Sequence, residues 1–291
     1  MTTGLPTCYS TSKPLFWWEI EIVIATDTNE ISTETIQSKV DEIYTYGLSL
    51  QKIFNFYDPT SELSLLNKNR VAEVSSTLRK LIEMWLSMCD LTNWAYDISL
   101  GKYILERKNK KTLSPQACSY KDITVNENTI TLTHPDAQID LGSIAKWYIT
   151  DCLAKACTEK WLSWLLDARW DIIAFGKYSE KIGIQDPRNN DKEVWNLVLH
   201  NNAVATSWDY KQYDTSYDTS HILHQGSYAS ITVVTPTLTE ADMLATALFV
   251  APYDMRQTII HKYSHAAIVC ILPDGTKEIY NDTSDIFTLT T

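Results

Sequence analysis

The chain has 291 residues, of which 44% are hydrophobic and 21% are charged, a composition that can bury a core and excludes an intrinsically disordered protein. Its 25 basic and 36 acidic residues give a formal net charge of -11, so no overall positive charge would attract nucleic acid or an anionic membrane. No apolar run approaches the roughly 18 residues of a membrane-spanning helix. We therefore expect a soluble protein with no membrane span and no nucleic-acid partner.

Glycine is scarce in this chain and tryptophan is abundant. There are 8 Gly and 10 Trp, whereas average usage would give about 20 Gly at this length. The six cysteines show no CxxC and no Cys/His ligand spacing, which argues against structural zinc and against a disulfide scaffold, so we interpret most of them as buried thiols. The first thirty residues lack the basic start and apolar stretch of a signal peptide, and we expect a cytoplasmic protein.

Helical and strand patterns alternate along the whole chain without a linker rich in Pro, Ser or Gly. In chain order, they predict a strand at 16–25, helices at 32–54 and 75–95, a hairpin at 121–133, a helix at 143–159, strands at 163–175, 181–185, 194–200, 203–207 and 228–235, helices at 239–250 and 254–263, and a hairpin at 266–280. We expect Ser32 or Thr33 to cap the first helix and Thr239 to cap helix 239–250. The pattern favours one α+β domain over residues 16–291, with mixed or antiparallel sheets interleaved with helices, after an N-terminal extension over residues 1–15.

The first candidate site is the segment from Asp140 to Lys146, where a strand end passes through Gly142 into a helix start. Free backbone N–H groups and the positive end of the helix dipole make such a junction suitable for an anion, and Lys146 adds a charge for phosphate. An ordinary strand-to-helix turn capped by Asp140 explains these residues at least as well.

The second candidate is the pair Asp242 and Thr246, which lie four residues apart and therefore share one face of a predicted helix. Hard oxygen ligands at this spacing suit Mg²⁺, which takes few protein oxygens together with substrate phosphates. A solvated acid in the first helical turn is the commoner explanation of such a residue.

The third candidate is the stretch Ala205-Thr206-Ser207, followed at some distance by His221 and His224. Histidine suits proton transfer near neutral pH, so either histidine could act as a base toward a hydroxyl, although two histidines near a turn are more often surface residues. The chain has no GxSxG, HExxH, Walker or GxGxxG motif, which excludes the commonest hydrolase, zinc-protease and dinucleotide-binding classes.

Taken together and in this order, a series of segments resembles the motifs of the ApbE family of FAD:protein FMN transferases. They are FYDPTSELSLLN at 56–67, YDISLG at 96–101, DLGSIAK at 140–146, DIIAFG at 171–176, GIQDPR at 183–188, ATS at 205–207, HIL at 221–223 and ADMLATA at 241–247. The resemblance covers roughly residues 16–272. Each motif is weak alone, but their common order is specific.

The resemblance implies an enzyme that binds FAD with Mg²⁺ on the diphosphate and transfers FMN through a phosphoester to a Thr or Ser hydroxyl of an acceptor flavoprotein, releasing AMP. It implies that Asp242 and Thr246 hold Mg²⁺ with a main-chain oxygen near Ser143. Asp242 and His221 would be the catalytic residues, and His221 would assist deprotonation of the acceptor hydroxyl. Residues placed at the FAD by the resemblance are Ser61, Glu62, Asn67, Asp140, Lys146, Thr206 and Ser207. Members of the family are often exported.

The chain departs from the family at positions where the family has glycine. It has Arg169-Trp170 before Asp171, Trp147 after Lys146 and Trp208 after Ser207; Ala95 also replaces a usual glycine, and His224-Gln225 replaces a DP pair. Glycine permits a positive φ or a close approach to a ligand, and tryptophan adds a large side chain at the same place. Two hypotheses follow: an active transferase with a reshaped cleft, or an inactive homologue that binds a nucleotide, a flavin or a protein partner. Burial in the core explains one of these tryptophans more readily than all three.

Overall fold

An eight-stranded sheet forms the centre of the structure. The structure is a computed structural model. It describes residues 7–15, 18–26, 31–109, 117–142, 144–161, 163–176, 179–187, 189–208 and 228–281. Its strands follow the order β1-β2-β6-β7-β10-β11-β12-β13, and every neighbouring pair is antiparallel. Their bounds are Thr7–Leu15 (β1), Trp18–Thr26 (β2), Trp164–Asp167 (β6), Ile172–Phe175 (β7), Ala203–Trp208 (β10), Ser230–Thr235 (β11), Ala267–Ile271 (β12) and Lys277–Tyr280 (β13).

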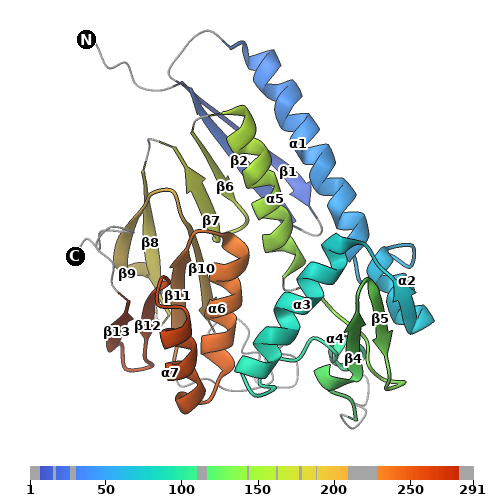
Figure 1. Ribbon diagram of the computed structural model, residues 1–291. Helices are drawn as coiled ribbons and strands as arrows, with labels where there is room; N and C mark the ends of the chain where they lie inside the picture. Colours follow the sequence, from blue (N-terminus) through green and yellow to red (C-terminus); the bar gives the residue numbers. More distant parts are fainter. Residues whose placement is uncertain are drawn as a thin grey trace.

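Four helices cover one face of this sheet (Figure 1). They are α1 (Thr33–Phe54), α5 (Ala145–Lys160), α6 (Leu238–Val250) and α7 (Tyr253–Lys262). The side chains of β2 alternate between an apolar and a polar face, which explains why helices cover only one face there. Ile20 and Ile22 are fully buried, while Glu19 and Glu21 on the other face are exposed. Helix α5 contacts both α1 and α6, so it is the central helix of the layer.

A hairpin of β8 (Glu180–Asp186) and β9 (Asn189–Leu199) packs behind part of the sheet in Figure 1. Leu197 and Leu199 join Val204 and Val269 in an apolar cluster separate from the one under the helices. The sheet is therefore enclosed on both faces at this end, and side chains on both faces of β10 and β11 are buried.

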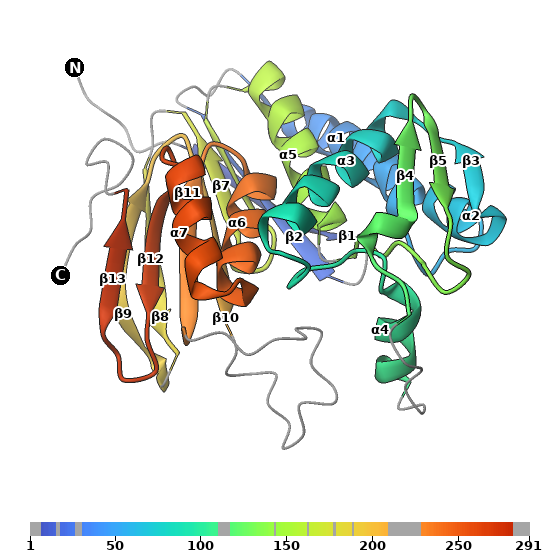
Figure 2. The same ribbon diagram turned by 60° about the horizontal axis from the view of Figure 1, so that its bottom comes forward.

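A second group of elements lies beside the helical layer (Figure 2). It comprises α2 (Glu62–Asn69), α3 (Ser76–Leu91), α4 (Gly101–Lys108), a 3₁₀ turn (Tyr120–Asp122) and a small antiparallel sheet of β3 (Val71–Glu73), β5 (Thr129–Leu132) and β4 (Ile123–Asn126). One apolar cluster includes Trp85 of α3, Leu66 of α2, Leu153 of α5 and Ile22 of β2. The two groups of elements consequently share one core.

The structure confirms the predicted α+β class with antiparallel sheets. It also confirms Ser32 as the cap of α1, with its side chain accepting a hydrogen bond from the Thr35 N–H, and the 121–133 hairpin, whose turn holds Glu127 at a φ of 51°. Four of the six cysteines are buried and all six are free thiols. Within the described ranges, none of the helices combines the length and apolarity that a membrane-spanning segment needs.

Three local predictions differ from the structure. Residues 7–15, predicted as part of an extension, form β1 and pair along their length with β2. The predicted strand 163–175 is two antiparallel strands, β6 and β7, because the chain reverses at Ala168 to Trp170. Thr237 caps α6 in place of Thr239, whose side chain instead bonds to Asp151 of α5.

Candidate functional site

Motif residues at the start of α2 form hydrogen bonds to the backbone of α2 itself and of neighbouring segments. Ser61 caps α2, accepting a hydrogen bond from the Ser64 N–H at 3.0 Å, and its hydroxyl donates to the Asn55 carbonyl at 2.7 Å. The Glu62 carboxylate accepts from the Ser75 N–H at the start of α3. Both residues were predicted to line the FAD, and in the structure both have backbone partners that explain their presence.

Asn67 ties α2 to the segment that leads into α5. Its side-chain amide donates to the Ile139 carbonyl and accepts from the Ile139 N–H, both at 2.8 Å. The same segment pairs with the YDISLG motif, since Gly101 N–H donates to the Gln138 carbonyl at 2.9 Å. A Cβ at Gly101 would lie 2.8 Å from that carbonyl oxygen, closer than real side chains approach, so this glycine is required by the close approach.

Asp140 lies one residue further along this segment. Its Oδ1 accepts from the Gly142 N–H at 2.8 Å, which makes a local turn and does not cap α5. The N-cap position of α5 is Ile144, which makes no side-chain cap hydrogen bond. Asp140 is therefore not at the cap position that was predicted for it, and the Ala145 N–H at the start of α5 donates to the Leu141 carbonyl at 2.8 Å.

Lys146 lies in the first turn of α5 and is 6% exposed. Its Nζ is 3.8 Å from Oδ2 of Asp171, which comes between β6 and β7. The ammonium also lies over two indole rings, 3.2 Å from the ring centroid of Trp147 and 4.7 Å from that of Trp18. Asp242, on α6, is close enough to raise the pKa of Lys146. We call Lys146, Asp171 and Asp242 the charged cluster.

Burial shifts the pKa of every member of the charged cluster. It lowers the pKa of Lys146, and the charges of Asp171 and Asp242 oppose that shift. It raises the pKa of Asp171 against the opposing charge of Lys146. It raises the pKa of Asp242 as well, and the neighbouring charge of Asp171 adds to the effect. Two carboxylates thus share one ammonium in a site that disfavours all three charges, which is typical of functional sites.

Hydroxyl groups on both faces of the sheet lie near the charged cluster. Thr206, on β10, donates its N–H to Oδ1 of Asp171 at 3.2 Å, and its hydroxyl contacts that of Thr232 at 2.9 Å. The next residue, Ser207, has its hydroxyl 3.1 Å from that of Thr246 on α6. The structure therefore brings together five residues singled out from the sequence: Lys146, Thr206, Ser207, Asp242 and Thr246.

Two predicted site residues, Ser143 and His221, lie outside the described residues. Within the described part of the chain, no three His, Cys, Asp or Glu side chains cluster in the manner of a metal site made by protein groups alone.

The residues at family glycine positions take three different environments. Arg169 and Trp170 both have left-handed backbone, with φ of 62° and 78°. Trp170 is 76% exposed, whereas Trp147 is 7% exposed and packs in the core. Trp208 is partly buried at the end of β10. Only the Arg169-Trp170 turn shows a backbone that favours glycine, and only Trp147 is a core residue.

The Trp147 ring covers Lys146 and also meets Asp242. Its indole N–H lies close enough to that carboxylate to lower its pKa, but its geometry falls short of a full hydrogen bond and Nε1 has no other partner within the described residues. The tryptophan thus occupies the interior of the charged cluster.

An open cavity of about 340 Å³ lies next to the charged cluster. Its lining includes Trp18, whose ring also contacts Lys146, and the Asp167 to Trp170 turn. The Asp167 carboxylate stabilises this turn by accepting from the Trp170 N–H at 2.8 Å. Arg169 and Trp170 therefore form one wall of this hollow, and Trp18 connects it to Lys146, which does not itself line it.

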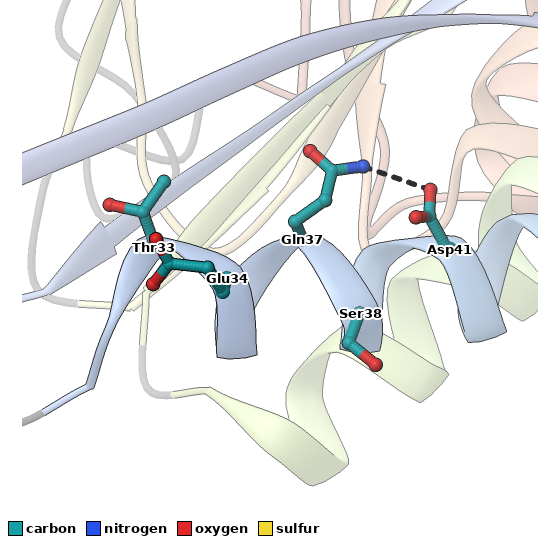
Figure 3. A pocket seen from close by; sticks show the side chains of 5 residues that line it. All are labelled: Thr33, Glu34, Gln37, Ser38 and Asp41. Carbon is teal, nitrogen blue, oxygen red and sulfur yellow. Dashed lines mark hydrogen bonds between the residues drawn. The ribbon is translucent and has the colours of Figure 1, made fainter.

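A larger hollow, of about 480 Å³, lies at the start of α1 (Figure 3). In it, Gln37 donates to Asp41 at 2.9 Å, and Asp41 also pairs with Lys13 at 2.7 Å. None of the predicted site residues lines it. We do not assign the function to this hollow.

Two residues of the site region received no role from the sequence. Asp171 was recognised only as part of a motif, although an acid that directly follows a pair of expected glycines would indicate a carboxylate held at a tight turn. Trp18 carried no signal, because an aromatic residue in a strand is ordinarily part of the packing.

The sequence matches the model of the ApbE family over residues 17–270. An FAD:protein FMN transferase of Haemophilus influenzae is 26% identical over 285 residues, covering 84% of this chain and 81% of that protein. One of Chlamydia muridarum is 24% identical, covering 83% and 85%. The ApbE protein of Thermotoga maritima superimposes with a TM-score of 0.79 at 22% identity, over 96% of this chain and 99% of that one. The flavin transferase ApbE of Vibrio cholerae gives 0.78 at 18% identity, over 97% and 99%.

Proposed function

Because this chain belongs to the ApbE family, we propose that it transfers FMN from FAD to a Thr or Ser hydroxyl of an acceptor flavoprotein in a Mg²⁺-dependent reaction. The relatives that carry the name FAD:protein FMN transferase support the reaction. The observation that carries the proposal is the meeting of Lys146 from α5 with Asp242 from α6 beside the hydroxyls of Ser207 and Thr246.

The donor set suits Mg²⁺. Asp242 and Thr246 lie one turn apart on α6, and they offer a carboxylate and a hydroxyl oxygen, which are hard ligands. The nearby Asp171 raises the pKa of Asp242, so a divalent cation would relieve the repulsion between the two carboxylates. Only two side chains would bind the ion. Such a small number is usual for Mg²⁺ when substrate phosphates and water complete its coordination shell. A main-chain oxygen near Ser143 would be the third protein ligand.

The reaction is a displacement at phosphorus. The acceptor hydroxyl oxygen forms a bond to the FMN-side phosphorus, the bond from that phosphorus to the bridging oxygen breaks, AMP leaves, and the hydroxyl proton passes to a base. Bound Mg²⁺ would neutralise charge that develops on the diphosphate.

The residues of the chain would bind and orient the FAD and would move the proton. Lys146 would place a positive charge at the diphosphate, in the first turn of α5 where the helix dipole is positive. His221 would take the proton from the acceptor hydroxyl. Thr206 and Ser207 would orient the cofactor, Ser207 through the hydroxyl that faces Thr246 of α6, with Asp140, Ser61, Glu62 and Asn67 along the more distant part of the FAD.

The second candidate is an inactive homologue that binds a nucleotide, a flavin or a protein partner. The position of Trp147 favours it, because the indole ring lies 3.2 Å from the Lys146 ammonium in the space that a diphosphate oxygen would use. For the active enzyme, this ring must turn aside or stack against the bound cofactor.

The test is a titration of the purified chain with FAD, with and without Mg²⁺, in which flavin fluorescence reports binding and released AMP reports turnover. We expect Mg²⁺-dependent release of AMP, and we expect Asp242→Ala to abolish it. Asp254→Ala, which removes an acid from the first turn of α7, is the matched control and should retain turnover. Binding of FAD without AMP release in the presence of a Thr-containing acceptor supports the inactive binder.

A further inference from the structure

The carboxylate of Asp151 joins α5 to α6. Its Oδ1 accepts from the Leu238 N–H at 2.8 Å, and its Oδ2 accepts from the Thr239 N–H at 2.8 Å and from the Thr239 hydroxyl. These partners form the first turn of α6, where N–H groups have no partner within the helix. Three donors from one helix therefore converge on one side chain of another.

The contact lies close to the charged cluster along both helices. Asp151 follows Lys146 by five residues, about 7 Å along α5, and Thr239 precedes Asp242 by three residues, about 4 to 5 Å along α6. A helix turns by about 100° per residue, so a shift of α6 by one residue would move Asp242 off the face that meets Lys146.

We propose that Asp151 is a positioning residue that fixes the first turn of α6 to α5, and thereby sets the distance from Lys146 to Asp242 and Thr246. The inference rests on the proposed function, in which those two residues of α6 hold Mg²⁺. Asp151 itself acts only through α6.

An ordinary helix cap does not explain Asp151. Thr237 already caps α6 from within the chain, with its side chain accepting from the Glu240 N–H at 3.4 Å. Burial raises the pKa of Asp151 to about 6 in spite of the hydrogen bonds from Thr239 and Leu238, so the fold keeps this acid at a cost in desolvation. A carboxylate on a different helix adds what the local cap lacks, a fixed relation between two helices.

The test compares Asp151→Asn with Thr237→Ala. The first variant replaces an acceptor oxygen facing Thr239 with an N–H₂ group, and the second weakens the same helix start without touching α5. Two readouts are taken as Mg²⁺ is varied: the rise in melting temperature without FAD, and the rate of AMP release at saturating FAD.

We expect Asp151→Asn to raise the half-saturating Mg²⁺ concentration by about tenfold to a hundredfold in both readouts, as found when residues that orient metal ligands are changed. Thr237→Ala should lower the melting temperature and leave the half-saturating Mg²⁺ concentration unchanged. Thr239→Val removes only the hydroxyl donor and should raise the half-saturating Mg²⁺ concentration by less. This variant replaces Asp151→Asn in the test if Asp151→Asn does not fold. Thr239→Ser keeps the hydroxyl and should have the native half-saturating Mg²⁺ concentration.

An unchanged Mg²⁺ requirement in Asp151→Asn, or an equal increase in Thr237→Ala, overturns the positioning role. A native chain that Mg²⁺ does not stabilise overturns it as well, together with the metal site. AMP release from the native chain distinguishes these failures from failure of the proposed transferase reaction, because it is measured in the same samples.

Asp97→Asn is a second matched control. This carboxylate also accepts three hydrogen bonds, from the N–H and hydroxyl of Ser99 and from the N–H of Tyr120. None of these donors belongs to α5 or α6. Its loss should destabilise the fold without changing the Mg²⁺ concentration at half-saturation.

Discussion

Two groups of motif residues in this protein use their polar atoms in opposite ways. Around α2, Ser61 and Asn67 are buried, and their side chains form hydrogen bonds to backbone at 2.7 to 3.0 Å. Between α5 and α6, the ammonium of Lys146 and the carboxylates of Asp171 and Asp242 face one another, and burial disfavours the charge on each. The polar atoms of the first group are satisfied by backbone, whereas burial opposes the charges of the second.

The difference separates architecture from chemistry. Asn67 connects α2 to Ile139, and that segment continues directly into α5. The α2 group therefore holds in place the chain that presents Lys146, and its motif residues can serve the site without touching a ligand. Burial disfavours the charges of the charged cluster, so the fold alone does not explain these residues. Binding of a metal ion or a diphosphate would explain them.

The largest expected effect is on the charged cluster. Asp242→Asn should lower kcat for AMP release by about a hundredfold to a thousandfold, the usual effect of removing one preorganised electrostatic group. Its free energy of unfolding in urea should be equal to or higher than that of the native chain, because burial and Asp171 disfavour the charge that is removed. A loss of stability together with activity would contradict the division drawn here.

The α2 group should show the reverse. Asn67→Ala removes a side chain that makes two buried hydrogen bonds to Ile139 and leaves both backbone partners unsatisfied. We expect a loss of about 2 to 3 kcal/mol in the free energy of unfolding. The exposed neighbour Lys68→Ala is the control for a change on the same helix and should have little effect. A loss below about 0.5 kcal/mol, typical of surface positions, would remove Asn67 from the architectural group.

Local sequence patterns predicted much of this fold. Apolar spacing and Ser32 predict α1, and the Asn126 to Asn128 turn predicts the hairpin of β4 and β5. The polar strand β1 was missed because an edge strand with alternating Ser, Thr and Lys, and with Pro14 near its end, lacks the usual apolar signal.

The remaining differences come from contacts distant in sequence. Thr239 fits a helix cap by its position, but Asp151, 88 residues away, binds its hydroxyl and N–H. The site residues on α5, β10 and α6 were candidates from local patterns and from the family motifs, whereas Asp171 needed the structure because its importance comes from Lys146 and Thr206 on two other elements.

A smaller effect is expected from pH. Burial raises the pKa of Asp151 to about 6 in the folded chain, above the usual value of about 3.9 in an unfolded chain. Between these values the folded chain holds a proton that the unfolded chain has released, so stability decreases as pH rises through this window, by about 3 kcal/mol over the whole window and about half of that above pH 5. Burial gives Asp171 a shift of the same sign.

Urea unfolding at pH 5, 6, 7 and 8 and constant ionic strength measures this dependence. Asp151→Asn should show a flatter profile than the native chain, and Asp41→Asn, at an exposed salt bridge on α1 where the pKa is lowered by Lys13, should not. An unchanged slope in Asp151→Asn would show that its carboxyl does not titrate in this range.

The smallest expected effect concerns the turn beside the charged cluster. Trp170 has a φ of 78° and is 76% exposed, so the folded state bears the cost of a left-handed bulky residue and gains little burial in return. Trp170→Gly should raise the free energy of unfolding by about 1 kcal/mol, since left-handed backbone costs about that much for a residue with a Cβ. Trp170→Ala keeps the Cβ and loses the ring, so it is the matched control and should give no gain. A gain of equal size in Trp170→Ala would assign the cost to the indole and not to the backbone. A loss of stability in both variants would place Trp170 with the α2 group, as a residue whose contacts hold the fold.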